Sequence, residues 1–162
     1  MHFYLIFLAL TFSLPLHAQK VVFSAPGNNF GVWRLTHDPH MLSHHGRDEN
    51  KIEELARIEA AEFKVLSEFL TKLKNVKESG GHLLDHTAVL FGSNLGNASS
   101  HSWHNLPILL AGGGYKHGHH VAHDPKNNTP FANLFVPLAQ RMGLEIEKFG
   151  SSTKSTIRGL QS

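Results

Sequence analysis

Histidine is the residue type whose number and spacing first suggest chemistry in this sequence. The chain has 14 histidines and no cysteine among 162 residues. Because no thiolate is available, a transition metal would be bound by imidazole, carboxylate and amide oxygen. This ligand set suits zinc, nickel, copper, iron or manganese in an open site. Most of the histidines gather in three short stretches, which cover residues 37–45, 101–104 and 117–123.

The first stretch has the pattern of a single helical turn. Asp38 is a favourable N-cap and Pro39 suits the first helical position. A helical turn would place His40 and His44 on one face, where two imidazoles can share a metal ion. His45 would point about 100° away from His44. The alternative is a polar surface turn whose histidines cap neighbouring backbone groups.

The second stretch lies between two apolar runs, residues 88–91 and 107–111, which are bounded by glycine. Such runs are typical of buried strands in an α/β sheet. The loop between them is rich in Ser, Asn and His, and ligands of such sheets usually bind beyond the carboxyl end of a strand. We therefore expect chemistry in this loop.

Together the two stretches define a candidate metal site, and zinc is the metal we favour. A bound metal would polarise a phosphoryl, sulfuryl or acyl oxygen and lower the pKa of a bound water. Imidazoles near the metal would serve as general base or acid, since they titrate near neutral pH. Ser43 and Ser93 are candidate nucleophiles, although serines that form turns explain them better. The predicted metal ligands are His40, His44, His101, Asn94 and Asp85, and the predicted catalytic residues are His45 and His104.

Two amphipathic helices are expected to position these residues. Residues 48–77 have apolar side chains at helical spacing, with acids and lysines that we assign to a solvated face. A second helix is expected after Thr129 as its N-cap, kinked or shortened by Pro137. Residues 144–149 are predicted to form a last short strand. The third histidine stretch is more typical of a surface loop than of a metal site.

Composition indicates one ordinary domain. Apolar residues make up 41% of the chain, and 15 Lys and Arg against 13 acids give a net charge of +2, which is too small to indicate a nucleic-acid partner. The apolar run 1–18 has the pattern of a cleaved secretory signal. The alternative is a strand or helix that stays in the fold. Residues 19–34 would be a linker or an N-terminal strand, and residues 156–162 a tail. The expected location is secreted or periplasmic, with no membrane span after cleavage.

Several motifs in order resemble one known family. The segment His40-Met41-Leu42-Ser43-His44-His45 is similar to the H-x-x-S-H-H signature of the HXXSHH-domain family, which are secreted bacterial proteins of unknown function. The resemblance covers residues 35–155. Family members are usually longer, and this chain resembles their C-terminal part alone. The further matching segments are LLDHTAVLFGSNLGNASSH, NLPILLAGGG, TPFANLF and RMGLEIEKFGSST.

A weaker similarity is to the C-terminal half of alkaline-phosphatase and sulfatase-like hydrolases. It implies an α/β fold in which a three-layer sheet is flanked by helices. By this similarity, residues 93–96 would occupy the position of the acidic-His-Gly metal motif of those hydrolases. His101 would occupy the position of a metal ligand that comes later in their sequences. Asn94 stands here where those enzymes have an acid, which puts a two-metal site in doubt. Nothing in this chain clearly replaces their nucleophile, which lies early in the sequence.

Three functions are left open. The first is a metal-dependent hydrolase of phosphate, sulfate or related esters, acting on an unidentified small molecule. The second is a non-catalytic secreted module for metal binding or interaction. The third is a remnant of a longer family member, whose parallel strands would need a partner chain or a missing N-terminal half.

Overall fold

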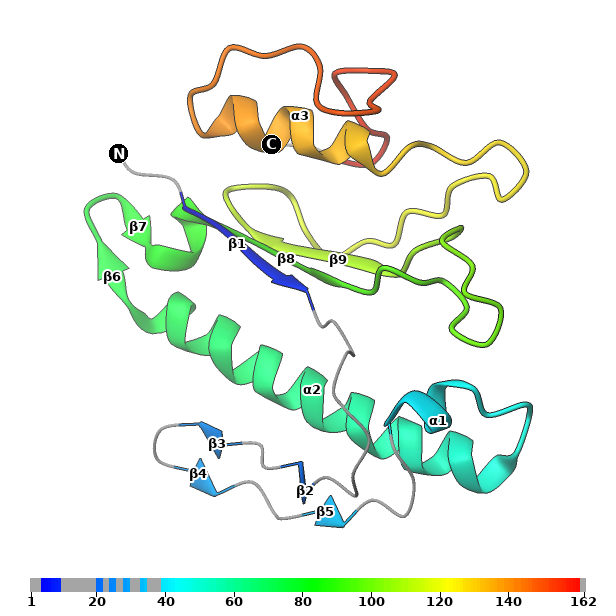
Figure 1. Cartoon of the computed structure of the whole chain (residues 1–162). Coiled ribbons are helices and arrows are strands. Elements are labelled where there is room, and N and C mark those ends of the chain that lie inside the picture. The colour runs from blue at the N-terminus through cyan, green and yellow to red at the C-terminus, as the bar shows by residue number, and fades with distance from the viewer. Residues whose placement is uncertain are drawn as a thin grey trace.

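The protein is described by a computed structural model, shown in Figure 1. The description covers the side chains of residues 40–160 and, before them, only the backbone of residue 39 and of five strands. In chain order the elements are β1 (Tyr4–Ala9), β2 (Lys20–Val21), β3 (Ser24–Ala25), β4 (Asn28–Asn29), β5 (Trp33–Arg34), α1 (Pro39–Ser43), α2 (Glu49–Asn75), β6 (Lys77–Glu78), β7 (Gly81–His82), the 3-10 helix η1 (Leu83–His86), β8 (Thr87–Gly92), β9 (Ile108–Gly112) and α3 (Ala132–Arg141).

The largest sheet has the strand order β1-β8-β9. β1 pairs with β8 in parallel, with Tyr4 opposite Thr87 and Ala9 opposite Gly92. β8 and β9 are antiparallel, so the expectation of parallel strands is wrong for this pair. The reason is that a loop connects them without a crossover helix, and parallel neighbours require such a crossover. The secretory signal at residues 1–18 stays a prediction. The alternative was a strand that stays in the fold, and β1 lies within these residues.

Helix α2 covers one face of the sheet. It confirms the predicted helix to within two residues at its ends. Asp48 caps it, because its carboxylate accepts the backbone N–H groups of Asn50 at 2.9 Å and Lys51 at 3.3 Å. Leu66 is buried against Val89 and Phe91 of β8. Within the part of the chain that the structure describes, no helix is long and apolar enough to cross a membrane.

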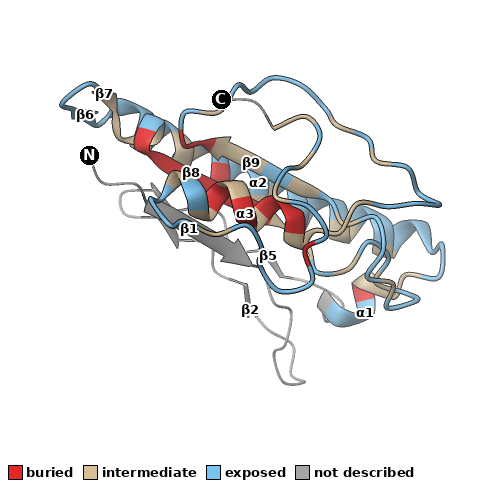
Figure 2. Ribbon diagram, turned by 90° about the horizontal axis from the view of Figure 1, so that it is seen from above, coloured by how far each residue is buried: buried red, intermediate tan, exposed pale blue. Residues whose placement is uncertain are grey.

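Helix α3 covers the opposite face of β8. Leu134 and Leu138 form a buried cluster with Ala88 and Leu90. Successive residues of β8 therefore alternate between the two helices, as the period of a strand requires. Figure 1 shows α3 above the sheet and α2 below it, and Figure 2 shows buried residues concentrated in β8 and α3. The mixed α/β class is confirmed.

The region around α3 differs from the prediction in two ways. The helix begins at Ala132 without a side-chain cap rather than directly after Thr129, and Pro137 lies inside its ten residues. The predicted strand at residues 144–149 is wrong. This segment folds back on α3, where Gln140 donates to the Ile146 carbonyl at 2.7 Å. Its backbone groups bond to the helix end in place of a neighbouring strand.

Asn133 is the polar residue that holds the C-terminal segment in place. Its side chain is fully buried. Its Oδ1 accepts the Thr153 N–H at 2.8 Å and the Lys154 N–H at 3.4 Å. A buried amide must find partners of this kind. Two of the family-like motifs, TPFANLF and RMGLEIEKFGSST, are therefore joined by a structural contact.

Candidate functional site

The predicted helical turn in the first histidine stretch is confirmed as α1. The His44 N–H donates to the His40 carbonyl at 3.2 Å, and the Ser43 hydroxyl donates to the same carbonyl at 2.8 Å. The turn brings the rings of His40 and His44 together, with centroids 4.6 Å apart and planes at 64°. The spacing of four residues thus places the two rings on one face of the turn, as the sequence predicts.

His101 reaches this pair from the loop between β8 and β9. Its Nε2 lies 3.0 Å from Nε2 of His44, although the two residues are 57 positions apart. A second contact joins the same segments, since the Ser99 hydroxyl donates to the Ser43 carbonyl at 3.3 Å. Figure 1 shows α1 beside the loop that comes after β8. We call His40, His44 and His101 the imidazole cluster.

The backbone of His101 is in an unusual conformation. Its φ is 50°, in the left-handed region. Its N–H donates to the Ala98 carbonyl at 3.2 Å, and Ser102 donates to Asn97 at 2.9 Å, so a tight turn carries the residue. A non-glycine residue in this region costs roughly 1 kcal/mol or more, and such residues concentrate at functional sites. His101, which has the strained backbone, is therefore also the residue whose side chain reaches α1.

The spacing of the two facing nitrogens is close to what a shared metal needs. With Zn–N bonds of about 2.0–2.1 Å, tetrahedral geometry separates two ligand nitrogens by about 3.3 Å. The observed 3.0 Å is a hydrogen-bond distance between His44 and His101. Among the side chains that the structure describes, no group of three or more His, Asp or Glu is already arranged to hold a metal. Metal binding would require these two nitrogens to move apart slightly and to give up their hydrogen bond.

His44 is held in the form that a metal requires. Partial removal from water lowers its pKa below the usual 6.5, and the like charges that His40 and His101 would carry lower this pKa further. At neutral pH the ring therefore stays uncharged and keeps a lone pair. Metal ligation needs this neutral imidazole.

Of the other two predicted metal ligands, Asp85 lies away from the cluster, and the role of Asn94 stays a prediction. The Asp85 carboxylate accepts the His82 N–H at 2.8 Å, at the start of η1. Asp85 precedes β8 whereas His101 comes after it, so a strand about 20 Å long separates them. Asn94 is exposed at the start of the loop. The structure thus brings together the three predicted histidine ligands.

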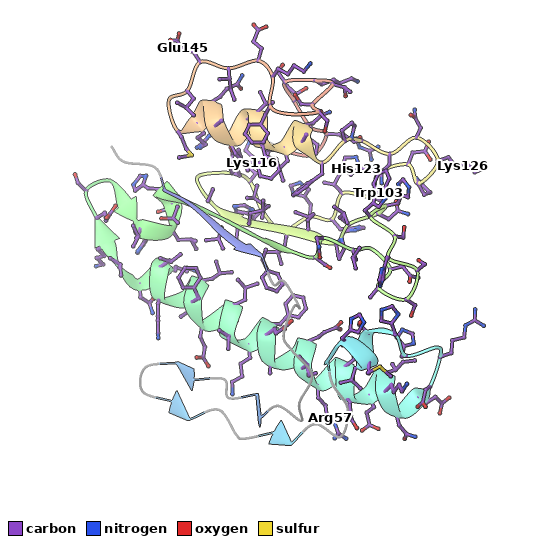
Figure 3. All side chains as sticks on the ribbon, in the orientation of Figure 1. Arg57, Trp103, Lys116, His123, Lys126 and Glu145 are labelled. Atoms are coloured by element: carbon purple, nitrogen blue, oxygen red, sulfur yellow. The ribbon has the colours of Figure 1, made fainter. Side chains whose placement is uncertain are left out.

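The predicted acid–base histidines have other contacts. Nδ1 of His45 accepts the Arg47 N–H at 3.1 Å. The His104 ring lies against the Trp103 ring, with centroids 4.1 Å apart. Trp103 is 70% exposed. In Figure 3 it lies with His123 and Lys126 on the side of the loop away from α1. A catalytic role for His45 and His104 stays a prediction.

Both candidate serine nucleophiles form turns. The Ser43 hydroxyl donates to the His40 carbonyl within α1. The Ser93 hydroxyl accepts the Leu95 N–H at 3.1 Å. These are the local hydrogen bonds by which serine commonly stabilises turns. The structure thus favours the turn-forming alternative for both residues.

The third histidine stretch binds backbone carbonyls. Nε2 of His117 lies 2.9 Å from the Gly112 carbonyl, and Nε2 of His119 lies 2.8 Å from the Gly159 carbonyl. A carbonyl only accepts, so both Nε2 atoms must carry a proton. These histidines fasten their loop to the end of β9 and to the C-terminal segment.

One ionisable residue was assigned to the wrong face of α2. Glu62 lies four residues after Ile58 and four before Leu66, both of which are buried, so it shares their face of the helix. Burial raises its pKa to about 7, and Glu59 adds to the shift. The assignment of all α2 acids to a solvated face is therefore wrong for this residue. The spacing from Ile58 and Leu66 is the signal that could have identified it.

Comparison of the chain with models of known protein families, with curated proteins and with solved structures gives no match. The resemblance to the HXXSHH-domain family and to alkaline-phosphatase-like hydrolases therefore stays a prediction from the motifs.

Proposed function

We propose that this chain is a secreted or periplasmic protein of the HXXSHH type whose imidazole cluster binds one divalent transition metal, with zinc the favoured ion. The observation that carries the proposal is the 3.0 Å approach of Nε2 of His101 to Nε2 of His44. These two histidines come from segments 57 positions apart, and their side chains are half-buried and exposed. Their convergence, with His40 beside them, is the arrangement expected of ligands that leave a position open.

The chemistry we propose is hydrolysis of a phosphate, sulfate or related ester. A metal held by neutral imidazoles keeps its full positive charge, which would polarise the ester oxygen and acidify a bound water. Ser43 and Ser93 both hold turns. Water rather than a serine of this chain is therefore the nucleophile that we propose.

The arrangement of elements supports the alkaline-phosphatase-like part of the proposal. Helices pack on both faces of β8. His101 lies beyond the carboxyl end of β8, and α1 contacts this loop through Ser99 and Ser43. Sites beyond the carboxyl ends of strands are usual in layered α/β folds. A full three-layer fold would then need further strands from a partner chain or an N-terminal half.

A second candidate function is a metal-binding module without catalysis. It is favoured by the position of His104, whose ring lies against that of Trp103 with the two planes tilted by 33°. A site with ligands and no general base would bind and release metal. The two functions share the metal site, and they differ in whether the bound metal activates a water for hydrolysis.

The test begins with the metal content of the full chain, expressed without a histidine tag and measured by elemental analysis. Thermal melting with and without a chelator is recorded on the same sample. About one metal per chain, and a melting temperature that falls on chelation, would support the site. A chain with no metal and no response to chelator or added zinc would refute it. Turnover of generic phosphate or sulfate esters with added zinc would then distinguish the hydrolase from the module.

A further inference from the structure

Strand β9 is paired on one side only. The sheet order is β1-β8-β9, so β9 forms an edge of the sheet in Figure 1. The register places Gly92 opposite Ile108. The Ser93 N–H donates to the Pro107 carbonyl at 3.3 Å. In an antiparallel ladder this bond flanks a pair that is not itself hydrogen-bonded, so the backbone groups of Ile108 and Leu110 point away from β8.

These outward groups leave a short stretch of the edge open. Within the part of the chain that the structure describes, no hydrogen bond is made to the outward N–H and C=O groups of Ile108 and Leu110. At the end of the strand the outward carbonyl of Gly112 is engaged, since Nε2 of His117 lies 2.9 Å from it. The open stretch is therefore residues 108–110.

The open stretch is flanked by exposed apolar side chains on the α2 side of the sheet. Leu109 is 37% exposed and lies opposite Phe91, which packs toward α2. Phe63 of α2 is 52% exposed, and its ring centroid is 5.5 Å from that of Phe91. No charged residue lies between His104 and Lys116, whereas edge strands that avoid association commonly carry lysine. These features favour the addition of another strand.

The open groups are complementary to those of a second copy of β9. When two β9 strands run antiparallel about a two-fold axis at Leu109, Ile108 of each copy lies opposite Leu110 of the other. Each such pair exchanges two N–H···O=C bonds, which uses every outward group of the open stretch. Leu109 then lies opposite Leu109 of the second copy in a pair without hydrogen bonds, where opposed side chains are closest. One axis thus joins the open backbone groups and covers the exposed leucine.

We propose that the open edge of β9 is the interface of a transient homodimer, in which two copies join antiparallel at Leu109 and form one continuous sheet. A second copy fits this edge better than a charged peptide, because an uncharged strand offers such a peptide no complementary group and does not repel itself. The contact is isologous, so it closes at two copies. It does not involve the imidazole cluster, so this inference and the metal site can each fail alone.

The experiment measures self-association of the full chain by sedimentation equilibrium between about 10 µM and 1 mM. A chelator is present so that zinc cannot bridge two chains. Leu109→Lys and Leu109→Glu each place like charges opposite each other at the axis, and an equimolar mixture places opposite charges there. Leu144→Lys is the matched control, because Leu144 is 55% exposed and comes after α3. Circular dichroism confirms that the variants fold.

The average mass of wild type is expected to rise with concentration toward twice that of one chain. Leu109→Lys and Leu109→Glu should each dimerise at least about tenfold more weakly, because like charges face each other and the apolar contact is lost. Their mixture should recover association, and Leu144→Lys should match wild type.

A cysteine at the axis tests the register directly. The chain has no cysteine, so Leu109→Cys forms an intermolecular disulfide only with a second copy. Opposed residues without hydrogen bonds have Cα atoms about 4.5 Å apart, which a disulfide can span. With oxidised glutathione as oxidant, the covalent dimer should form at least about tenfold faster than in Leu144→Cys, because the thiols at the axis have a high effective concentration.

Several results would overturn the inference. A wild-type chain that stays monomeric up to about 1 mM would refute it and leave the edge to a strand of another sequence. Association that Leu109→Lys does not weaken, or that the mixture of opposite charges does not restore, would place the contact elsewhere. Equal rates of cross-linking in Leu109→Cys and Leu144→Cys would contradict the two-fold register. Zinc affinity, measured separately, decides the proposed function whatever these results are.

Discussion

Two regions of this molecule are both rich in histidine but differ in the atoms that their ring nitrogens face. In the imidazole cluster, the nitrogen of His101 faces the nitrogen of His44 across 3.0 Å. In the third stretch, His117 and His119 face the carbonyl oxygens of Gly112 and Gly159. A ring nitrogen that meets a carbonyl must donate a proton, whereas of two ring nitrogens that meet each other one donates and the other accepts with a lone pair that a metal could take in place of the hydrogen bond.

If the proposed metal site is right, the atom that faces a histidine nitrogen, rather than the density of histidines, separates a metal ligand from a structural residue. The third stretch has four histidines within residues 117–123, yet two of them fasten the loop. The cluster draws on two segments that are remote in sequence and includes His101, whose backbone is strained. Variants of the two regions, compared side by side, test this contrast.

The largest effect is expected on zinc affinity. His44→Ala combined with His101→Ala removes two of the three proposed ligands and should weaken zinc binding about 1,000-fold or more. His117→Ala combined with His119→Ala should leave the affinity within about threefold of wild type, because those nitrogens already serve carbonyls. Competition with a chromophoric chelator measures both variants.

His101→Asn is the control for the backbone. Asparagine tolerates the left-handed conformation of His101 but supplies no imidazole. It should lose zinc as His101→Ala does, if the ring is the ligand. Stoichiometric tight zinc in the His44/His101 double variant would refute the cluster as the site, and a loss confined to the His117/His119 variant would reverse the comparison.

A smaller effect is expected on the stability of the metal-free chain, and here the His117/His119 double variant should lose more than the His44/His101 double variant. The His117/His119 double variant loses two hydrogen bonds to backbone carbonyls. The free energy of unfolding should fall by about 1–2 kcal/mol. The His44/His101 double variant should lose less than this, since solvent-accessible imidazoles that face each other contribute little. Urea unfolding checks both values, and equal losses would show that the cluster is structural too.

The smallest effect is on the pH dependence of stability. The pKa of His44 is lowered from 6.5 in the folded chain, chiefly by removal from water and then by His40 and His101. The unfolded chain therefore takes up a proton first, and the contribution of His44 is lost as pH falls below about 6.5. Glu62 has the opposite sign, because its pKa rises from 4.5 to about 7 and stability falls as pH rises through that range.

The measurement for this prediction is urea unfolding of the metal-free chain between about pH 5.5 and 8. Glu62→Gln serves as the background, since it removes the opposing titration. Adding His44→Ala to it should flatten the loss of stability toward low pH. Adding His117→Ala serves as the matched comparison and should leave the slope in place. Identical slopes with and without His44 would contradict the lowered pKa.

Local patterns were sufficient for much of the fold. The helix α2, the turn α1 and the two strands around the loop were predicted from spacing and from glycine boundaries, because helix and strand periods are written in neighbouring residues. The strand predicted at residues 144–149 was wrong, since a strand needs a partner and this segment instead bonds to α3 through Gln140. The direction of β9 likewise depended on a connection rather than on its own residues.

The candidate site divides in the same way. The sequence by itself determined the pairing of His40 with His44, because four residues make one helical turn. Only the tertiary structure decided that His101 joins His40 and His44 and that Asp85 does not. Asp85 and His101 lie beyond opposite ends of β8. The partner of His119 is 40 residues away. Contacts at such separations are set by the packing of helices on a sheet, which no local spacing records.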